Sequence, residues 1–473
     1  MKNINRVCCV VLCVIMILSF ASCKKGQTTN TEKPFEPTDG IALWNKIDET
    51  MKQLVSYETD GTGKMVYFYL GNKYEMTSSS KIVEDAKEGD PYSYMYDKVV
   101  VACPELSLDE TTEYTKAYRD GKMYLSNVTG QNEQKFFSAM TFEEFLATDD
   151  DSLTKDINYT DCTKSEFAKN EDGTWSLKLS GYTMKTINVM IDNMNMSELD
   201  MGADILDMEI TVVADSKFRA TKMDIKLIFE IGEDPAIVPE FLFSSNYSKF
   251  DEVQRDPAQL NTEGFVEVDD VRVLRKVADG IEKIQNAASG KFTLDLKQTV
   301  KILGESSTTI EKDTVTYGKQ NGGYYYNATA KVGSVKYEIS YKSGTQTVKQ
   351  GSETYTEAMT DKEAKLYVDD LINAAYYNET LISSIEKVEE GVYKFTVDNP
   401  DTSVIESQLS GVATVKSATE EIIVTLSGDS VTRIESKIKI NGRYISGGFN
   451  EALTMTISAT VVPEQVAEST VVA

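Results

Sequence analysis

Two stretches of the chain carry apolar residues at helical spacing, and each is followed by a long series of alternating segments. In the first stretch the apolar positions recur at steps of three, four and three, at Trp44, Ile47, Met51 and Leu54. The second stretch repeats the same steps at Leu274, Val277, Ile281 and Ile284. This spacing places four apolar side chains on one face of a helix. The segments that follow alternate as half-buried strands do, for example at 65–70, 291–296 and 336–341.

Short matching segments indicate that the chain contains a duplication. Four segments of the first half recur in the same order in the second half: 118–121 as 341–344, 139–141 as 358–360, 171–175 as 389–393, and 214–216 as 428–430. Repetition in one order along a chain is the signature of an internal repeat. A helical insertion is predicted in each copy, at 141–147 and at 361–382.

The length of the chain also favours two domains, because a single hydrophobic core rarely serves more than about 250–300 residues. We expect a signal peptide, a lipidated cysteine with a flexible tether, two repeats joined by a linker, and a C-terminal tail. The expected boundaries are 1–22, 23–38, 39–250 for the first repeat, 251–267 for the linker, 268–463 for the second repeat and 464–473.

The N-terminus has the pattern of a secretory signal. Lys2 and Arg6 precede an apolar run that ends in the small residues Ala21 and Ser22, directly before Cys23. This end resembles the lipobox of bacterial lipoproteins, in which the cysteine thiol is joined to diacylglycerol and the mature chain begins at the cysteine. The resemblance implies attachment to the cell membrane, outside the cytoplasm, through acyl chains such as palmitate.

A plain transmembrane anchor is the alternative to lipidation at Cys23. The apolar run from Val7 to Ala21 is shorter than the roughly 18–20 residues that a helix needs to span a bilayer. The sequence therefore favours the lipid anchor.

Composition argues against several classes of function. The chain has no histidine, which removes Ser-His and Cys-His catalytic pairs and histidine-ligated metals. It has no phosphate-binding glycine loop and no grouped carboxylates, so we expect no enzyme activity, no cofactor and no metal site. The formal net charge of −26 opposes binding to nucleic acid. A hydrolase that uses carboxylates remains a minor alternative.

Two cysteines, Cys103 and Cys162, remain outside the signal region and Cys23. An extracytoplasmic location allows them to form a disulfide. The alternative is two buried thiols, and the sequence does not decide between them because it gives no distance between the two residues.

A methionine-rich stretch is the most unusual local feature. Met184, Met190 and Met194 fall on one face of a predicted helix. Methionine suits surfaces that accept varied apolar partners, so a lid over an apolar cavity is one interpretation. Ordinary packing of a helix on the sheet is the simpler interpretation, and Cu(I) binding through thioethers is a third.

The order of elements resembles the half-barrel of LolA and LppX-like lipoprotein carriers. It consists of a leading helix, a strand meander, a helical insertion and further strands, behind a lipid anchor. The resemblance implies an α+β fold with two tandem domains, each a large curved antiparallel sheet packed on a few helices. It also implies binding of a lipid or similar amphiphile between sheet and helices, where we place Trp44 and Met51 of the leading helix with the three methionines. The alternative is an envelope module that senses or binds a protein partner without a small ligand.

Overall fold

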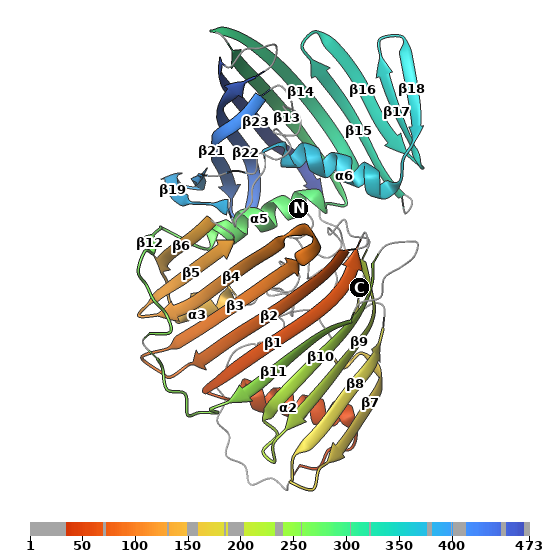
Figure 1. Ribbon diagram of the computed structural model, residues 1–473. Helices are drawn as coiled ribbons and strands as arrows, with labels where there is room; N and C mark the ends of the chain where they lie inside the picture. Colours follow the sequence, from red (N-terminus) through yellow and green to blue (C-terminus); the bar gives the residue numbers. More distant parts are fainter. Residues whose placement is uncertain are drawn as a thin grey trace. The chain divides into compact units, whose positions relative to one another are not determined.

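The computed structural model divides into two compact units, residues 1–267 and 268–473. The residues that the structure describes are 35–69, 72–129, 132–148, 159–183, 186–187, 203–231, 240–256, 258–302, 304–320, 323–375, 381–398, 400, 413–445 and 451–467. Each unit is built on one large sheet (Figure 1).

Unit 1 contains a 12-stranded sheet with the strand order β12-β6-β5-β4-β3-β2-β1-β11-β10-β9-β8-β7. Its strands are β1 (Ser56–Tyr69), β2 (Asn72–Asp85), β3 (Tyr92–Cys103), β4 (Leu108–Arg119), β5 (Lys122–Thr129), β6 (Asn132–Ala139), β7 (Cys162–Lys169), β8 (Trp175–Tyr182), β9 (Ala203–Ala214), β10 (Ala220–Ile231), β11 (Glu240–Ser248) and β12 (Val266–Glu267). The helices are α2 (Gly40–Lys52), α3 (Phe142–Ala147) and the 3-10 helix η1 (Pro104–Leu106). All neighbouring strands are antiparallel except β12 and β6.

Unit 2 contains an 11-stranded antiparallel sheet with the order β18-β17-β16-β15-β14-β13-β23-β22-β21-β20-β19. Its strands are β13 (Ser289–Ile302), β14 (Glu305–Gln320), β15 (Gly323–Val332), β16 (Val335–Lys342), β17 (Thr345–Gln350), β18 (Glu353–Ala358), β19 (Ser384–Glu389), β20 (Val392–Val397), β21 (Ala413–Ser427), β22 (Ser430–Tyr444) and β23 (Glu451–Ala467). Its helices are α5 (Val273–Gln285), α6 (Asp361–Ile372) and the 3-10 helix η3 (Asn373–Ala375).

Apart from β12, the two sheets have the same topology. In both, the first strand pairs with the second and also with the last strand of its unit, so β1 meets β11 and β13 meets β23. These long-range pairings bring the two halves of each meander into one sheet. The two large antiparallel sheets agree with the prediction from sequence, but the structure is mostly β, whereas the predicted class was α+β.

Local details repeat as well. Asp120-Gly121 and Ser343-Gly344 form equivalent two-residue turns with positive φ, which glycine adopts without steric cost at the second position. Met140 N–H donates to Gly121 O at 3.0 Å, and Met359 N–H donates to Gly344 O at 3.1 Å. The segments that the sequence pairs as a repeat therefore occupy the same structural position.

Each helical insertion begins with the same capping box. Thr141 and Glu144 cap α3 reciprocally, and Thr360 and Glu363 cap α6 in the same way. In both boxes the threonine N–H donates to the glutamate at 2.7 Å, and the glutamate N–H donates to the threonine Oγ1 at 3.2 Å. The insertion predicted at 361–382 ends earlier as a regular helix, because α6 stops at Ile372.

The leading helices pack one apolar face onto their sheets, as their spacing predicts. Leu43, Trp44, Ile47 and Met51 of α2 lie in the apolar core of unit 1, and α2 contacts β7 and β8. The predicted face of α5 is likewise buried, at Leu274, Val277, Ile281 and Ile284. Leu54 is buried too, although it lies beyond the end of α2 at Lys52.

The segment expected to be an interdomain linker packs along the sheet of unit 1 instead. We call residues 249–256 and 258–265 the strap. Val253 and Leu260 of the strap are buried among Val83, Tyr92, Tyr94, Ala117 and Tyr124, on the face of the sheet opposite α2. After the strap, β12 pairs with β6, so the whole stretch to Glu267 belongs to unit 1.

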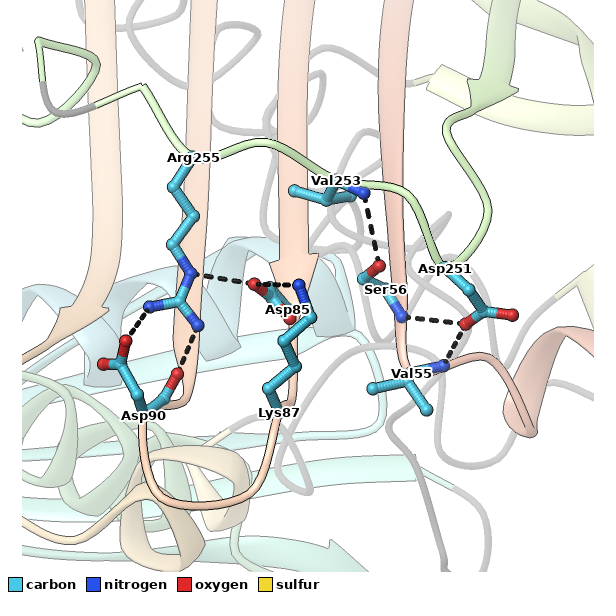
Figure 2. Close-up of polar contacts among 8 residues, drawn as sticks. All are labelled: Val55, Ser56, Asp85, Lys87, Asp90, Asp251, Val253 and Arg255. Atoms are coloured by element: carbon cyan, nitrogen blue, oxygen red, sulfur yellow. Dashed lines mark hydrogen bonds and ion pairs between the residues drawn. The ribbon is translucent and has the colours of Figure 1, made fainter.

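Polar contacts fasten the strap at two points (Figure 2). Arg255 Nε donates to the buried carboxylate of Asp85 at 2.8 Å, and its Nη1 donates to Asp90 at 2.7 Å. Asp251 Oδ1 accepts from the backbone N–H of Val55 at 2.8 Å and of Ser56 at 3.3 Å. Because Asp85 is buried, its pairing with Arg255 removes the cost of an isolated charge.

At the other end of the chain, β23 continues to Ala467, beyond the expected start of the tail at position 464. In the part of the chain that the structure describes, no helix has the length and apolar character needed to cross a membrane. Cys23 and the signal region lie outside the described residues.

Candidate functional site

The site is a line of side chains that crosses the sheet of unit 1 at right angles to its strands. We call the side of each sheet that carries its leading helix the helix face. Strand side chains alternate between faces, so Asp97 lies on the same face as the core residues Val99, Val101 and Cys103. Strand pairing aligns Asp97 with one residue on each neighbouring strand, and we call this line the acid row of unit 1.

The acid row of unit 1 has a polar and an apolar half. From β11 to β6 its residues are Ser245, Gly61, Ser80, Asp97, Tyr114, Asn127 and Gln134. From β10 to β7 it continues with Met223, Val212, Leu177 and Phe167. A single transverse line therefore changes from apolar to polar where β10 meets β11.

Gly61, in the polar half of the row, leaves room for side chains from both neighbouring strands. A Cβ atom at this position would lie 2.2 Å from Ser80 Oγ and 2.6 Å from Phe243 Cζ. The hydroxyl of Ser80 and the ring of Phe243 thus lean over β1 from both sides, which a larger residue at position 61 would prevent.

Asp97 is the least satisfied residue of the row. Its side chain is fully buried, and neither carboxyl oxygen has a hydrogen-bond partner. Burial raises the pKa of Asp97 well above its usual range, because the charged form of a carboxyl group is disfavoured away from water. Thr59 Oγ1 and Ser78 Oγ, one row to either side, are also buried without partners.

A positively charged group also lies on this face. Lys116 is one row closer to α3, and its ammonium group lies 5.0 Å from the centre of the Phe145 ring. The raised pKa of Asp97 comes from burial of its carboxyl group. Asp97 lies between the apolar core side chains of its own strand, such as Val99, and the polar side chains of its row.

Unit 2 has a row of the same kind around Asp313. From β14 to β18 it contains Asp313, Ala330, Tyr337, Gln350 and Glu353. From β13 to β20 it contains Leu294, Val461, Ile434, Val424 and Tyr393. This acid row of unit 2 is again apolar towards the last strands of the unit and polar towards its early strands.

The two rows occupy equivalent positions. Tyr114 and Tyr337 lie an equal number of residues before the equivalent turn glycines, Gly121 and Gly344. The strand that carries the acid differs between the units. Asp97 is on the third strand of unit 1, and Asp313 is on the second strand of unit 2. Ser80 of unit 1 occupies the position of Asp313.

Two acids on the helix face of unit 2 have raised pKa values. Burial, with a contribution from the neighbouring Glu311, raises the pKa of Asp313 to about 7. Asp313 Oδ1 has no hydrogen-bond partner. Burial also raises the pKa of Glu420 to about 7, although Ser436 Oγ donates to its carboxylate at 2.5 Å.

Tyrosines tie the helices of unit 2 to its sheet beside this row. The carboxylate of Asp361, the first residue of α6, accepts from Tyr341 OH at 2.5 Å and from Tyr324 N–H at 2.9 Å. Tyr317 OH donates to Ile284 O on α5. Tyr367 of α6 stacks on Tyr326 with ring centroids 5.0 Å apart.

The residues predicted to contact a ligand are only partly described. Trp44 and Met51 come together on one face of α2, but both are buried in the apolar core, where Trp44 contacts Tyr159 at 5.4 Å between ring centroids. Met184, Met190 and Met194 lie outside the described residues.

Cys103 and Cys162 are free thiols in this structure. Cys103 is buried in the core, and its Sγ lies 3.7 Å from Glu105 Oε2. Cys162 is half-buried, and burial together with Asp161 raises the pKa of its thiol. Of the two alternatives that the sequence leaves open, the structure shows the one without a disulfide.

The buried acids are not among the residues predicted from sequence, although the strands contain a signal for them. Asp97 shares the alternation phase of Val99 and Val101, and Asp313 shares that of Val315 and Tyr317. An aspartate at a strand position where alternation calls for an apolar residue can therefore be recognised from the sequence.

Across the described residues, no group of three or more cysteine, aspartate and glutamate side chains could hold a metal ion.

Comparisons with known proteins give no family. No family model matches the chain, and no curated protein matches its sequence. Solved structures with some similarity include a DUF1329 family protein from Desulfovibrio piger (8% identity, TM-score 0.18, covering 44% of this chain and 96% of that one). They also include a protein provisionally named AttH from Nitrosomonas europaea (8%, 0.15, 92% and 99%) and OccK3 from Pseudomonas aeruginosa (7%, 0.12, 86% and 95%). At TM-scores below 0.2, none of these similarities is evidence for a shared fold or function.

Proposed function

We propose that this chain is a membrane-anchored, extracytoplasmic lipoprotein that binds an amphiphile on the helix face of its sheets. The observation that carries the proposal is the acid row, which joins an apolar half to a polar half in both units. An amphiphile placed along such a row would lay its tail over one half and its head group over the other. Burial of the tail would contribute about 0.8 kcal/mol for each CH₂ group.

In this proposal each sheet is a curved half-barrel of the LolA and LppX-like kind, with its helices on the inner side. Two features support it. The strand order is the same in both units apart from β12, and α2 and α5 each pack an apolar face on the sheet of their unit. The space between helix and sheet is where such a carrier would hold acyl chains.

The proposed anchor is Cys23, and the start of the described chain is consistent with a short tether. Phe35 packs edge-to-face on Phe218 of unit 1, with ring centroids 5.4 Å apart. The residues between Cys23 and Phe35 can span at most about 40 Å when fully extended. A lipid at Cys23 would therefore keep this part of unit 1 close to the membrane surface.

We propose binding rather than catalysis, with no cofactor, because the chain has no histidine and no recognisable catalytic motif. The proposed contacts are the membrane, through the lipid, and the bound amphiphile.

Native mass spectrometry of the full chain, purified from its own membranes in a polyoxyethylene detergent, tests the binding function. We expect adducts whose mass corresponds to a co-purified amphiphile and which survive exchange into fresh detergent. A chain that carries no such adduct, and that takes up none of a series of added twelve-carbon amphiphiles, would contradict the proposal and favour a protein-interaction module.

The intact mass of the same preparation tests the anchor. We expect a chain that begins at Cys23 and carries diacylglycerol. The Cys23→Ser variant should retain residues 1–22 and lack the lipid mass. A wild-type chain that keeps residues 1–22 would contradict lipidation without affecting the amphiphile test.

A further inference from the structure

The strongest unexplained feature is the presence of a buried acid in the equivalent row of both units. A buried polar atom without a partner costs about 1–3 kcal/mol, and more if it is charged. Asp97 carries this cost at both carboxyl oxygens, and Asp313 carries it at Oδ1. In both units the acid lies on the helix face, where apolar residues of the same phase surround it.

The surrounding groups indicate what would satisfy these acids. In the acid row of unit 1 and the rows next to it, the unpartnered atoms include the hydroxyl oxygens of Ser245, Thr59 and Ser78, which can donate or accept. Around Asp313 the neighbouring group is Glu311, whose carboxyl adds a further acceptor. Both settings therefore favour a partner that supplies hydrogen-bond donors.

A negatively charged head group would fit neither setting. It supplies no donor to the unpartnered carboxyl oxygens of Asp97 and Asp313, and it would repel their ionised forms strongly in an environment of low dielectric. An amine or a polyol would instead donate to the carboxyl group, and an ammonium group would also stabilise its ionised form.

We propose that Asp97 and Asp313 are the head-group sites of two equivalent ligand-binding sites, one in each unit, for an amphiphile whose head group donates hydrogen bonds and carries no negative charge. The proposal rests on the amphiphile-binding function and specifies its ligand class and stoichiometry. In unit 1 the apolar half of the row, which would receive the tail, consists of the buried core residues Met223, Val212 and Leu177. In unit 2 the corresponding residues are Val461, Ile434 and Val424.

Native mass spectrometry of the full chain with three twelve-carbon probes tests the head-group class. The probes are dodecylamine, dodecyl glucoside and dodecanoate, added at equal concentration to chain in a polyoxyethylene detergent. We expect up to two bound molecules of dodecylamine or dodecyl glucoside per chain, and at least tenfold weaker binding of dodecanoate. Preferential binding of dodecanoate would overturn the proposed head-group class.

Substitution of each acid tests the two sites. Leucine has a branched shape similar to that of aspartate but no acceptor, so Asp97→Leu and Asp313→Leu should each reduce the stoichiometry from two to one. The double variant should bind none of the probes. If either leucine variant fails to fold, Asp97→Asn or Asp313→Asn removes the ionisable group with less change in volume and should weaken dodecylamine binding at least tenfold at that site.

Matched controls exist on the opposite face of the same sheets. Asp60 precedes Gly61 and Asp295 follows Leu294, and both side chains are exposed and pair with lysines. Asp60→Leu and Asp295→Leu should keep two binding sites. Undiminished binding of the probes to the double variant of Asp97 and Asp313 would overturn this inference while leaving amphiphile binding in place, whereas absence of binding to the wild-type chain would contradict both.

Discussion

The two units share a strand order but differ in how they accommodate a buried acid. In unit 1 the acid is Asp97 on β3, among serine and threonine hydroxyls. In unit 2 it is Asp313 on β14, with Glu311 beside it. The row is retained while the strand that supplies the acid changes, which indicates that the position along the strands matters more than the particular strand.

The faces opposite the helices also differ. In unit 1 the strap covers Tyr92, Tyr94 and Tyr124, and Arg255 fastens it to the buried Asp85. In unit 1, strands β2 to β5 therefore make apolar contacts on both faces of the sheet. The strap follows the last long strand of unit 1 along the chain, so its packing adds to the stability of that unit.

Tryptophan fluorescence can separate the stabilities of the units. The chain has two tryptophans, Trp44 and Trp175, and both lie in the core of unit 1. Their emission reports unfolding of unit 1, whereas circular dichroism reports both units. A change confined to unit 2 should therefore move the dichroism signal without moving the tryptophan transition.

The largest expected effect concerns the ionisation of Asp313. Its pKa in the folded state is raised to about 7, above the ordinary value near 4. Between pH 4 and 7 the unfolded chain has lost a proton that the folded chain still holds. Asp313 should therefore lower the free energy of unfolding of unit 2 as pH rises through this window, by at most about 1.4 kcal/mol per pH unit, and its contribution should level off above pH 7.

The Asp313→Asn variant removes the contribution of Asp313 and leaves the similar contribution of Glu420 in place. Glu311 and Tyr367, the titratable groups that interact with Asp313, remain in both proteins, as does the raised pKa of Glu420. The variant should be more stable than wild type at pH 8, by at most about 4 kcal/mol, and equal to it below pH 4. Asp295→Asn, on the opposite face, should leave the profile unchanged. A variant with the wild-type slope would show that Asp313 ionises normally in the folded state.

The second effect concerns the strap and unit 1. Arg255→Ala leaves the buried Asp85 without its closest cation and removes the contact of the guanidinium with the Tyr92 ring. Removal of one partner of a buried pair typically costs about 3 kcal/mol. Denaturation followed by tryptophan emission should show this loss in unit 1, while the transition of unit 2 stays in place.

Lys87→Ala is the matched control for the strap. Lys87 reaches the same Asp85 oxygen at 3.4 Å, but its side chain is 54% exposed. An exposed ion pair contributes about 0–1 kcal/mol, so this variant should remain close to wild type. Equal losses in the two variants would indicate that Asp85 needs any nearby cation rather than the strap.

Much of the fold could be predicted from local patterns. The helical spacing of Leu274, Val277, Ile281 and Ile284 identifies the buried face of α5, and the turn at Asp120-Gly121 recurs at Ser343-Gly344. These features depend on residues close together in sequence. The α+β expectation was less accurate, because strands dominate the described residues of both units.

The rows and the strap could not be predicted in the same way. The acid row depends on the pairing of β1 with β11 and of β13 with β23, which joins residues far apart in the chain. A shift of one residue in either pairing would move the whole set of side chains to the other face. The apolar anchors of the strap on this face, Val253, Leu260 and Phe265, are irregularly spaced in a polar stretch, so its sequence is typical of a linker.

The smallest expected effect tests whether the two insertions are equivalent. Thr141→Ala and Thr360→Ala each remove a capping-box hydroxyl with the same geometry, so each should cost about 1 kcal/mol. The first change should appear in the tryptophan transition and the second in the dichroism of unit 2. Thr141→Ser and Thr360→Ser keep the hydroxyl and should be near neutral. In unit 2, α6 is also held by the hydrogen bonds from Tyr341 and Tyr324 to Asp361. If only Thr141→Ala lowered the free energy of unfolding, these hydrogen bonds rather than the capping box would fix α6.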